Sequence, residues 1–233
     1  MQKLSITWFG HSTFLILTPG GTRVIFDPWL IENPACPVSM KKPPKVDLIL
    51  VSHGHSDHMS DVVPVARESG APVVAVFELC EWLRRRGLSN LQPMNKGGSL
   101  QIAGLRITMT DARHSSGYVD SGQMTYMGEP AGYVIRLEDG ITLYFAGDTA
   151  LFGDMRLIGE MYRPDIAFLP IGDRFTMDPV AAAKACELLG VRQVVPMHWG
   201  TFPMLTGTPD ELRPLVEPRG VQVIELKPGE TTD

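Results

Sequence analysis

The sequence predicts an α/β protein built as a four-layer αββα sandwich, in which two packed β-sheets carry helices on their outer faces. Short apolar or alternating runs, which are typical of strands, recur along both halves of the chain. Glycine-containing turns separate several of these runs in the first half, and helical and strand patterns alternate after residue 145. Strands in both halves with helices between them favour two sheets that are each covered by helices.

Two turns predict hairpins. The segments TPGGTR at 18–23 and LEDGIT at 137–142 place glycine between β-type runs, and hairpins are the simplest connection of such runs. We therefore expect the first half to be rich in antiparallel pairs. The predicted strands cover residues 4–9, 14–18, 23–26, 46–51, 72–76, 105–110, 132–137, 141–145, 165–169, 193–196 and 221–225.

Helical patterns fall between these strands. The last one begins with TPDE, which predicts Thr208 as N-cap, Pro209 at the first helical position and Glu211 closing a capping box. The basic triplet 84–86 ends another predicted helix, where cations suit the carbonyl end of the helix dipole. The predicted helices cover residues 60–68, 78–86, 155–161, 179–189 and 209–216.

The composition is that of a compact globular chain. Of its 233 residues, 44% are hydrophobic and 20% are charged, and we expect residues 1–233 to form a single domain. The formal net charge is −5. Binding of nucleic acid requires a clustered basic face, so we expect no nucleic-acid partner.

The cysteines indicate a reducing compartment. Cys36, Cys80 and Cys186 are far apart and lack CxxC spacing, so we expect neither disulfides nor a cysteine metal site. No apolar stretch approaches the roughly 20 residues that span a bilayer, and residues 1–9 lack the regions of a signal peptide. The sequence therefore predicts a soluble cytoplasmic protein without a membrane partner, and leaves open whether the chain forms a homo-oligomer.

All six histidines lie just beyond predicted strands. Three of them occur in HGHSDH at 53–58, directly behind the strand 46–51. Strand ends and the loops that follow them commonly present functional groups from a rigid scaffold. The other strand-end residues are His11 in FGHSTF, His114 in DARHSSG, Asp148 in FAGDT and His198 in PMHWG.

Imidazole and carboxylate are ligands for zinc, iron, manganese and nickel, and two nearby ions can share a carboxylate and a hydroxide. In HxHxDH the turn sends alternate side chains to different sides, so His53 and His55 can bind one ion while Asp57 and His58 bind its neighbour. A lone histidine is more often a structural residue. The cluster of three histidines and an aspartate, together with His114, Asp148 and His198 at other strand ends, favours two divalent ions. Zinc is the metal expected first. Two such ions leave the site positive and favour anionic or carbonyl-containing small molecules.

With these residues, the chain resembles the metallo-β-lactamase superfamily from the first strand to the last helix. HGHSDH, His114, Asp148 and His198 correspond in order to its motifs, which implies a dinuclear site at one edge of an αββα sandwich. The resemblance implies that His53, His55 and His114 bind the first ion. It further implies that Asp57, His58 and His198 bind the second ion, with Asp148 bridging the two.

The segments WFGHSTF, LPIGDRFTM and PMHWGTFP are similar to the uncharacterised metal-dependent hydrolase branch of that superfamily. This branch is related to ascorbate-6-phosphate lactonase and, more distantly, to a phospholipase D acting on N-acylethanolamine lipids. Arg174 departs from the pattern of the branch, where asparagine often follows the GD pair. The chain also lacks the long insert with which nuclease members grip RNA.

The predicted activity is that of a metal-dependent hydrolase, of the lactonase or phosphodiesterase type. A metal-bridging hydroxide attacks a small ester, lactone or phosphodiester. Asp57 orients the hydroxide and passes its proton to the leaving group. No serine or cysteine nucleophile is required, so turn or capping roles are expected for Ser12, Ser52 and Ser115.

Other residues are candidates for contacts around the ions. His11 lies outside the seven-ligand set, and we expect it to orient a ligand or to touch the substrate. Arg174 and Arg113 are candidate anion clamps, although a solvated role is equally compatible with each. Trp199 and Tyr118 either line the pocket or simply pack. Hydrogen bonds to ligand histidines are expected from Asp27 and Asp173.

Two other functional classes compete with hydrolysis. One is a di-iron oxidoreductase of the same fold; its flavodi-iron members carry a carboxylate where His55 stands and a flavin domain that this chain lacks. The other is a metal-binding module without turnover. The intact ligand set argues against the second alternative.

Overall fold

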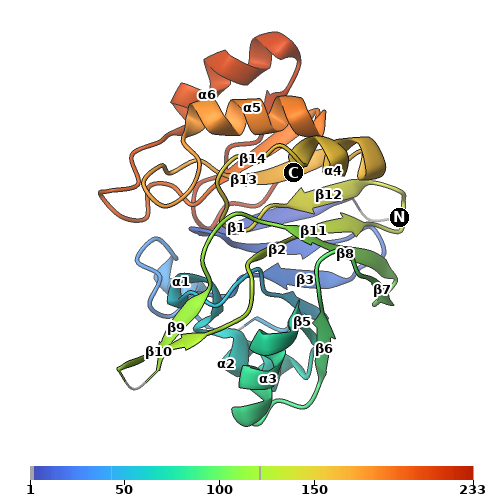
Figure 1. Ribbon diagram of the computed structural model, residues 1–233, viewed down its shortest axis with the longest axis vertical. Coiled ribbons are helices and arrows are strands. Elements are labelled where there is room, and N and C mark those ends of the chain that lie inside the picture. The colour runs from blue at the N-terminus through green and yellow to red at the C-terminus, as the bar shows by residue number, and fades with distance from the viewer. Residues whose placement is uncertain (1–2, 43, 121, 233) are drawn as a thin grey trace.

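The computed structural model describes residues 3–42, 44–120 and 122–232 (Figure 1). Two β-sheets pack face to face, with α4, α5 and α6 outside one sheet and α2 and α3 outside the other. This arrangement is the predicted αββα sandwich. The helices are α1 Ser56–Met59, α2 Val62–Ser69, α3 Phe77–Arg85, α4 Met155–Tyr162, α5 Pro179–Leu189 and α6 Pro209–Val216, with 3-10 turns at Val38–Met40 and Glu217–Arg219.

The first sheet has the order β1-β2-β3-β4-β5-β6. Its strands β1, β2 and β3 pair antiparallel, and the hairpin predicted at 18–23 joins β2 to β3. From β3 to β6 every pair is parallel, so within the first half the expected antiparallel pairing holds for β1 to β3 and for β7 with β8 but not for β3 to β6. Helices return the chain between the later strands, as parallel pairing requires. The bounds are β1 Ser5–Gly10, β2 Thr13–Leu17, β3 Arg23–Phe26, β4 Leu48–Leu50, β5 Val73–Val76 and β6 Leu91–Met94.

The second sheet has the order β15-β14-β13-β12-β11-β8-β7. The predicted hairpin at 137–142 joins β11 to β12 antiparallel, and β12 to β15 pair parallel. A separate hairpin, β9 Gly117–Asp120 with β10 Gln123–Tyr126, follows β8. The other bounds are β7 Ser99–Ile102, β8 Leu105–Asp111, β11 Ala131–Arg136, β12 Thr142–Phe145, β13 Ile166–Pro170, β14 Gln193–Met197 and β15 Gln222–Val223.

Four short strands were not predicted. β6 contains Pro93, which demotes a run as a strand signal, and β7, β9 and β10 carry exposed or half-buried positions without a clear apolar face. The predicted helix 60–68 also differs, because the chain forms α1 before it and starts α2 only at Val62. Between the two helices, the buried Asp61 carboxylate accepts bonds from Leu30 N and Ile31 N.

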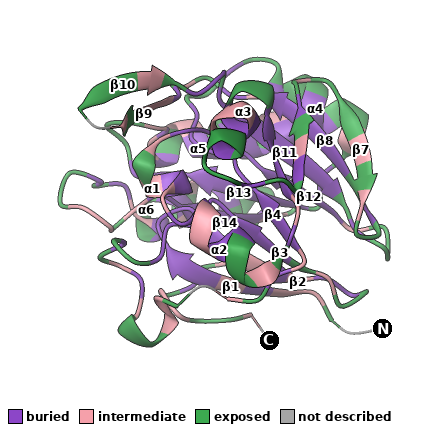
Figure 2. Cartoon of the chain, turned by 90° about the horizontal axis from the view of Figure 1, so that it is seen from below, coloured by how far each residue is buried: buried purple, intermediate pink, exposed green. Residues whose placement is uncertain are grey.

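The core lies between the sheets and beneath the outer helices (Figure 2). Aromatic rings join the two sheets: Phe26 stacks on Phe145 at 4.5 Å between centroids, and Phe14 meets the edge of Phe168 at 5.0 Å. Burial of each such side chain stabilises the fold by about 1.5–3 kcal/mol. Among the described residues, no helix is long and apolar enough to cross a membrane.

Candidate metal centre

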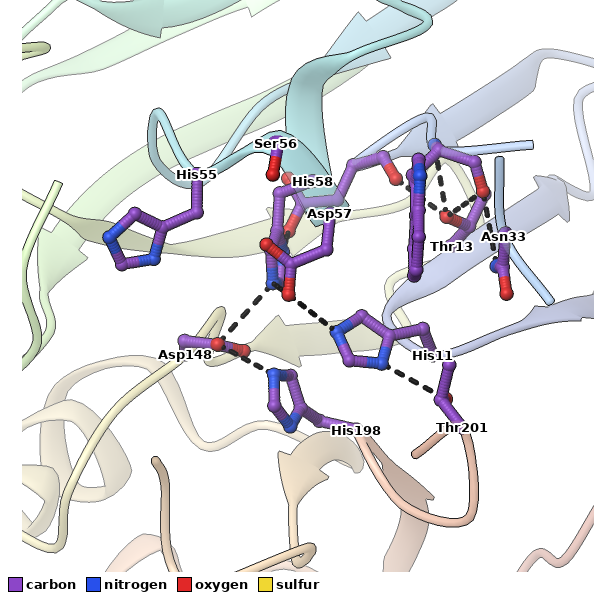
Figure 3. Close-up of polar contacts among 12 residues, drawn as sticks. His11, Thr13, Asn33, His55, Ser56, Asp57, His58, Asp148, His198 and Thr201 are labelled. Carbon is purple, nitrogen blue, oxygen red and sulfur yellow. Dashed lines mark hydrogen bonds and ion pairs between the residues drawn. The ribbon is translucent and has the colours of Figure 1, made fainter. Parts of the chain in front are cut away.

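The strand-end residues gather at one edge of the sandwich, where α1 and the loops after β12 and β14 lie together (Figures 1 and 3). The one-turn helix α1 is joined to β4 by residues 51–55, and His55 occupies its N-cap position. Gly54 precedes it at a point where an added Cβ would collide with Met127, so the turn requires glycine there. The seven residues that the sequence proposed as ligands are His53, His55, Asp57, His58, His114, Asp148 and His198.

Three histidines form a first group. His53, His55 and His114 each offer a ring nitrogen, and these three atoms lie within 4.8 Å of one another. His53 Nε2 is 2.9 Å from His55 Nδ1, and the His114 ring lies 5.2 and 5.0 Å from the other two rings. Imidazole nitrogens that converge in this way can hold one divalent ion.

A second group contains Asp57, His58 and His198, together with His11. Asp148 borders both groups: its Oδ2 lies 2.9 Å from His198 Nε2, 3.3 Å from His58 Nε2 and 3.6 Å from His114 Nε2. Figure 3 shows Asp148 between His58 and His198. A carboxylate in this position can contact an ion in either group.

Asp27 orients one histidine of each group. Its Oδ2 accepts bonds from His58 Nδ1 at 2.8 Å and from Ser52 Oγ at 2.6 Å, while Oδ1 accepts from Ser52 N at 2.7 Å. A hydroxyl has one hydrogen, so Ser52 Oγ must accept from His53 Nδ1, 2.9 Å away. When their rings are neutral, His53 and His58 therefore turn Nε2 atoms without a hydrogen towards the centre. Bonds of this kind commonly hold metal-binding histidines.

The expected bond from Asp27 to a candidate ligand histidine is thus present, whereas the turn or capping role expected for Ser52 is wrong. Ser52 links Asp27 to His53 because its side chain is buried beside both. The sequence signal for this role was a hydroxyl residue directly before the first histidine. Ser115 Oγ similarly lies 3.3 Å from His55 Nε2, the ring nitrogen opposite the one near His53.

The charges at the centre depend on one another. Burial disfavours a charge on His58, but Asp148 and Asp57 raise its pKa well above the usual value. Burial by itself would raise the pKa of Asp148, yet His198 and His58 hold it well below the usual range. Carboxylates buried this deeply need a nearby positive charge. A proton on His58 can supply it, and so can a divalent cation.

Unpartnered buried atoms also fit a cation. Among the described residues, five buried side-chain atoms lack a hydrogen bond, and three of them belong to candidate ligands: His58 Nε2, Asp148 Oδ1 and His198 Nδ1. An unpaired buried polar atom costs about 1–3 kcal/mol. The donor set consists of imidazoles and carboxylates, which suit zinc, manganese, iron or nickel. The residues present therefore fit divalent metal ions.

Backbone conformation is unusual at the same place. His11, Asp27 and His198 have positive φ values of 58°, 42° and 55°, although none is glycine. Left-handed conformations of larger residues are costly and cluster at functional sites. Gly172 lies so close to the His198 carbonyl that an added Cβ would overlap it.

His11 is fully buried, and its ring lies between two polar partners (Figure 3). Its Nε2 is 3.0 Å from Asp57 Oδ2, and its Nδ1 is 3.0 Å from Thr201 Oγ1. Burial, followed by the effect of His198, lowers the pKa of His11 to about 4, which leaves the ring neutral at pH 7. Thr201 was not proposed from the sequence, because 190 residues separate it from His11.

The remaining candidates are Asp173, two arginines and two aromatic residues. Asp173 is exposed in a turn with a φ of 66°, and its N–H donates to Met177 O. It lines a cavity of about 250 Å³ at the start of α5 and α6 and makes no bond to a histidine among the described residues, so that expectation is wrong.

The two arginines are exposed. The Arg113 guanidinium pairs with Asp111 at 3.0 Å, while its backbone N–H donates to Thr149 Oγ1 beside the Asp148 loop. The Arg174 guanidinium lies over the ring of Phe175 at 5.5 Å. Neither contacts a candidate ligand in the described part of the chain.

The two aromatic candidates pack. Trp199 stacks on Trp8 at 5.4 Å and donates its indole N–H to Pro196 O at 3.3 Å. Tyr118 meets the edge of Trp82 at 5.2 Å.

A cavity of about 550 Å³ lies away from the candidate ligands, between the ends of α4 and α5. The centre is therefore identified by the chemistry of its donor atoms and not by the volume of a cavity.

Comparisons with known proteins identify the family of the chain. A family model described as a beta-lactamase superfamily domain matches residues 22–199. A UPF0173 metal-dependent hydrolase of Koribacter versatilis is 49% identical over 231 residues, covering 99% of this chain and 98% of the relative. Another, from Rubrobacter xylanophilus, is 50% identical over 228 residues, covering 97% and 94%.

A solved structure extends the likeness to three dimensions. Igni18, a metallo hydrolase from Ignicoccus hospitalis, superimposes with a TM-score of 0.87 at 36% identity, covering 98% of this chain and 97% of that chain. The fold, the clustered histidines and these relatives point to one family. The chain therefore belongs to the metallo-β-lactamase superfamily and, within it, to the UPF0173 metal-dependent hydrolases.

Proposed function

We propose that this metal-dependent hydrolase uses two divalent ions to cleave a small ester, lactone or phosphodiester. His53, His55 and His114 bind the first ion, Asp57, His58 and His198 bind the second, and Asp148 contacts both. The observation that carries this proposal is the approach of three histidine nitrogens to Asp148 Oδ2, at 2.9, 3.3 and 3.6 Å. Asp27 accepts the hydrogen of His58 Nδ1 on the far side of the ring, so a neutral His58 turns a nitrogen without a hydrogen towards an Asp148 oxygen 3.3 Å away.

When bound, the ions supply a water whose pKa falls from 15.7 to about 7 and a Lewis acid for the oxygen that gathers charge. Asp57 then moves the proton. Its Oδ2 lies 3.0 Å from His11 Nε2, which leaves Oδ1 to take a proton and deliver it to the leaving group. The Asp57 side chain is 29% exposed, whereas His58 and His198 are at most 3% exposed, so Asp57 is the member of its group that a substrate can reach.

The charge of the centre favours anionic or carbonyl-containing small molecules. Two divalent ions bring a formal charge of +4, and the carboxylates of Asp57 and Asp148 offset about half of it. A substrate that is negative, or becomes negative in the transition state, is therefore stabilised. We further propose that the chain works in the cytoplasm as a single domain, without a nucleic-acid or membrane partner.

Metal analysis and a substrate screen test the proposal together. Protein stripped by a chelator is reconstituted with Zn²⁺ or Mn²⁺, its metal content is measured, and lactones, phosphodiesters, esters and thioesters are assayed. We expect two ions per chain and turnover that chelator removes and either metal restores. Full activity with one ion, or activity that survives complete metal removal, would overturn the dinuclear mechanism. Two bound ions without turnover of any substrate would favour a metal-binding module.

A further inference from the structure

We propose that His11 is a further ligand of the second ion, so that this ion is held by His11, Asp57, His58 and His198 in addition to Asp148. The inference rests on the proposed function, because it assumes that a second ion binds at this group. The superfamily pattern that the sequence follows assigns seven ligands and leaves His11 out. The geometry of its ring instead resembles that of the assigned histidines.

The first argument is distance. The donor atoms of His11, Asp57, His58 and His198 all lie within 4.8 Å of one another. His11 Nε2 is 3.0 Å from Asp57 Oδ2. Two donors that each lie about 2.1 Å from one ion are about 3 Å apart when they subtend roughly a right angle at it. The observed spacing therefore fits two ligands of one ion as well as it fits a hydrogen bond, and the position of the hydrogens distinguishes the two.

The second argument concerns which ring nitrogen of His11 carries the hydrogen. Thr201 Oγ1 lies 3.0 Å from His11 Nδ1 and 3.4 Å from Trp199 O. The hydroxyl has one hydrogen, and a carbonyl oxygen can only accept. If Thr201 donates to Trp199 O, it must accept from His11 Nδ1. His11 Nε2 is then bare and faces a carboxylate oxygen at 3.0 Å, which is repulsive unless a cation lies between the two atoms.

The third argument is that the same design occurs twice more in the centre. His53 donates from Nδ1 to Ser52, and His58 donates from Nδ1 to Asp27, so each ring in its neutral form turns an Nε2 without a hydrogen inwards. His11 repeats this arrangement, with Thr201 as the acceptor. A neutral ring with one nitrogen held outside and the other turned inwards is the usual form of a metal-binding histidine.

The backbone holds His11 in this position. Its carbonyl accepts bonds from His198 N and Trp8 Nε1, both at 3.0 Å, and its φ is 58°. The ring of His11 lies 4.0 Å from the ring of His198. The turn after β1 is thereby bonded to the loop after β14, so His11 is held beside candidate ligands that come from both sheets.

With His11 as a ligand, the two metal sites differ in their number of protein ligands. The first ion has three histidines and Asp148, the four-ligand set that zinc prefers. The second has five protein ligands and, with one water, suits six-coordinate ions such as Mn²⁺, Fe²⁺ or Ni²⁺. We therefore expect a mixed metal content, with the second site discriminating against zinc more strongly than the first.

Metal titration of His11→Gln tests the assignment, because glutamine keeps a hydrogen-bond donor for Asp57 but removes the imidazole. We expect calorimetry to find two binding steps in the wild type. In the variant, one step should weaken by more than about 100-fold and the other should stay unchanged. The Co²⁺-loaded variant should have a more intense visible absorption band, because the intensity rises as the coordination number falls.

Thr201 supplies a second, milder test. Thr201→Val should weaken the same step by about 10-fold, and Thr201→Ser should restore it, because serine keeps the hydroxyl. Thr206→Ala, at an exposed position in the same loop, is the matched control and should leave both steps unchanged. Thermal unfolding of the metal-free proteins checks that each variant folds.

Unchanged affinities and an unchanged Co²⁺ spectrum in His11→Gln would overturn the assignment, even if turnover slowed; His11 would then only hydrogen-bond Asp57. A wild type that binds a single ion would instead overturn the proposed dinuclear function, and this inference with it. The two failures are therefore distinguishable.

Discussion

The carboxylate of Asp27 lies 2.8 Å from His58 Nδ1, and both side chains are fully buried. Burial raises the pKa of Asp27, and the bonds from His58 and Ser52 oppose that rise. Through Ser52 the same carboxylate also reaches His53. A single acidic residue thus sets the ring orientation of one histidine in each group.

Asp27→Asn should weaken both metal-binding steps by about 10–100-fold. Asp27 Oδ2 now accepts hydrogen bonds from two donors, His58 Nδ1 and Ser52 Oγ. Asparagine has only one side-chain oxygen, and an NH₂ group in place of Oδ2 could not accept these bonds. His53 and His58 would therefore both lose their orientation. Calorimetric titration of the metal-free protein measures the effect. An affinity change confined to one ion would contradict the shared role of Asp27.

Ser52→Ala should weaken only the step that belongs to His53. The variant removes the acceptor of His53 Nδ1–H and leaves a buried donor unpaired, at a cost of about 1–3 kcal/mol. The bond from Asp27 to His58 is untouched, so the second ion should bind as before. The same titration checks this result, with Ser89→Ala at an exposed position as the control. Equal weakening of both steps would argue against the pathway through Ser52.

Gly172→Ala should lower both stability and affinity for the second ion. The new Cβ would overlap the carbonyl oxygen of His198, and backbone cannot move aside as a flexible side chain can. We expect a loss of about 1–3 kcal/mol in unfolding free energy, measured by chemical denaturation, together with weaker metal binding. Gly153→Ala, where an added Cβ meets nothing within 4 Å, is the control. Identical behaviour of the two variants would disprove the close approach.

The thiols should react slowly in the folded protein. Burial raises the pKa of Cys80 and of Cys186 to about 12, and raises that of Cys36 as well. Because a raised pKa leaves less thiolate, little of the reactive form exists at pH 8. Titration with a thiol reagent should find three thiols at once only after denaturation. Rapid labelling of the native protein at pH 8 would contradict the burial of these side chains.

The features predicted correctly from the sequence are those that depend on neighbouring residues. α5 and α6 have the predicted bounds, and the capping box of Thr208 and Glu211 is formed, because helix ends depend on a few neighbouring residues. Most strand positions were predicted for the same reason. The parallel pairing of β3 to β6 was missed, since strand direction depends on segments far apart in the chain.

The sequence by itself determined the helix caps, most of the strands and the residue types at the strand ends, because each depends on short-range periodicity and spacing. Only the tertiary structure decided which polar side chains meet. His11 reaches Thr201 across 190 residues, and of the two aspartates expected to bond a ligand histidine only Asp27 does so, with His58 at a separation of 31 residues. Such contacts form when packing of the two sheets brings distant loops to one edge, and no local pattern encodes that encounter.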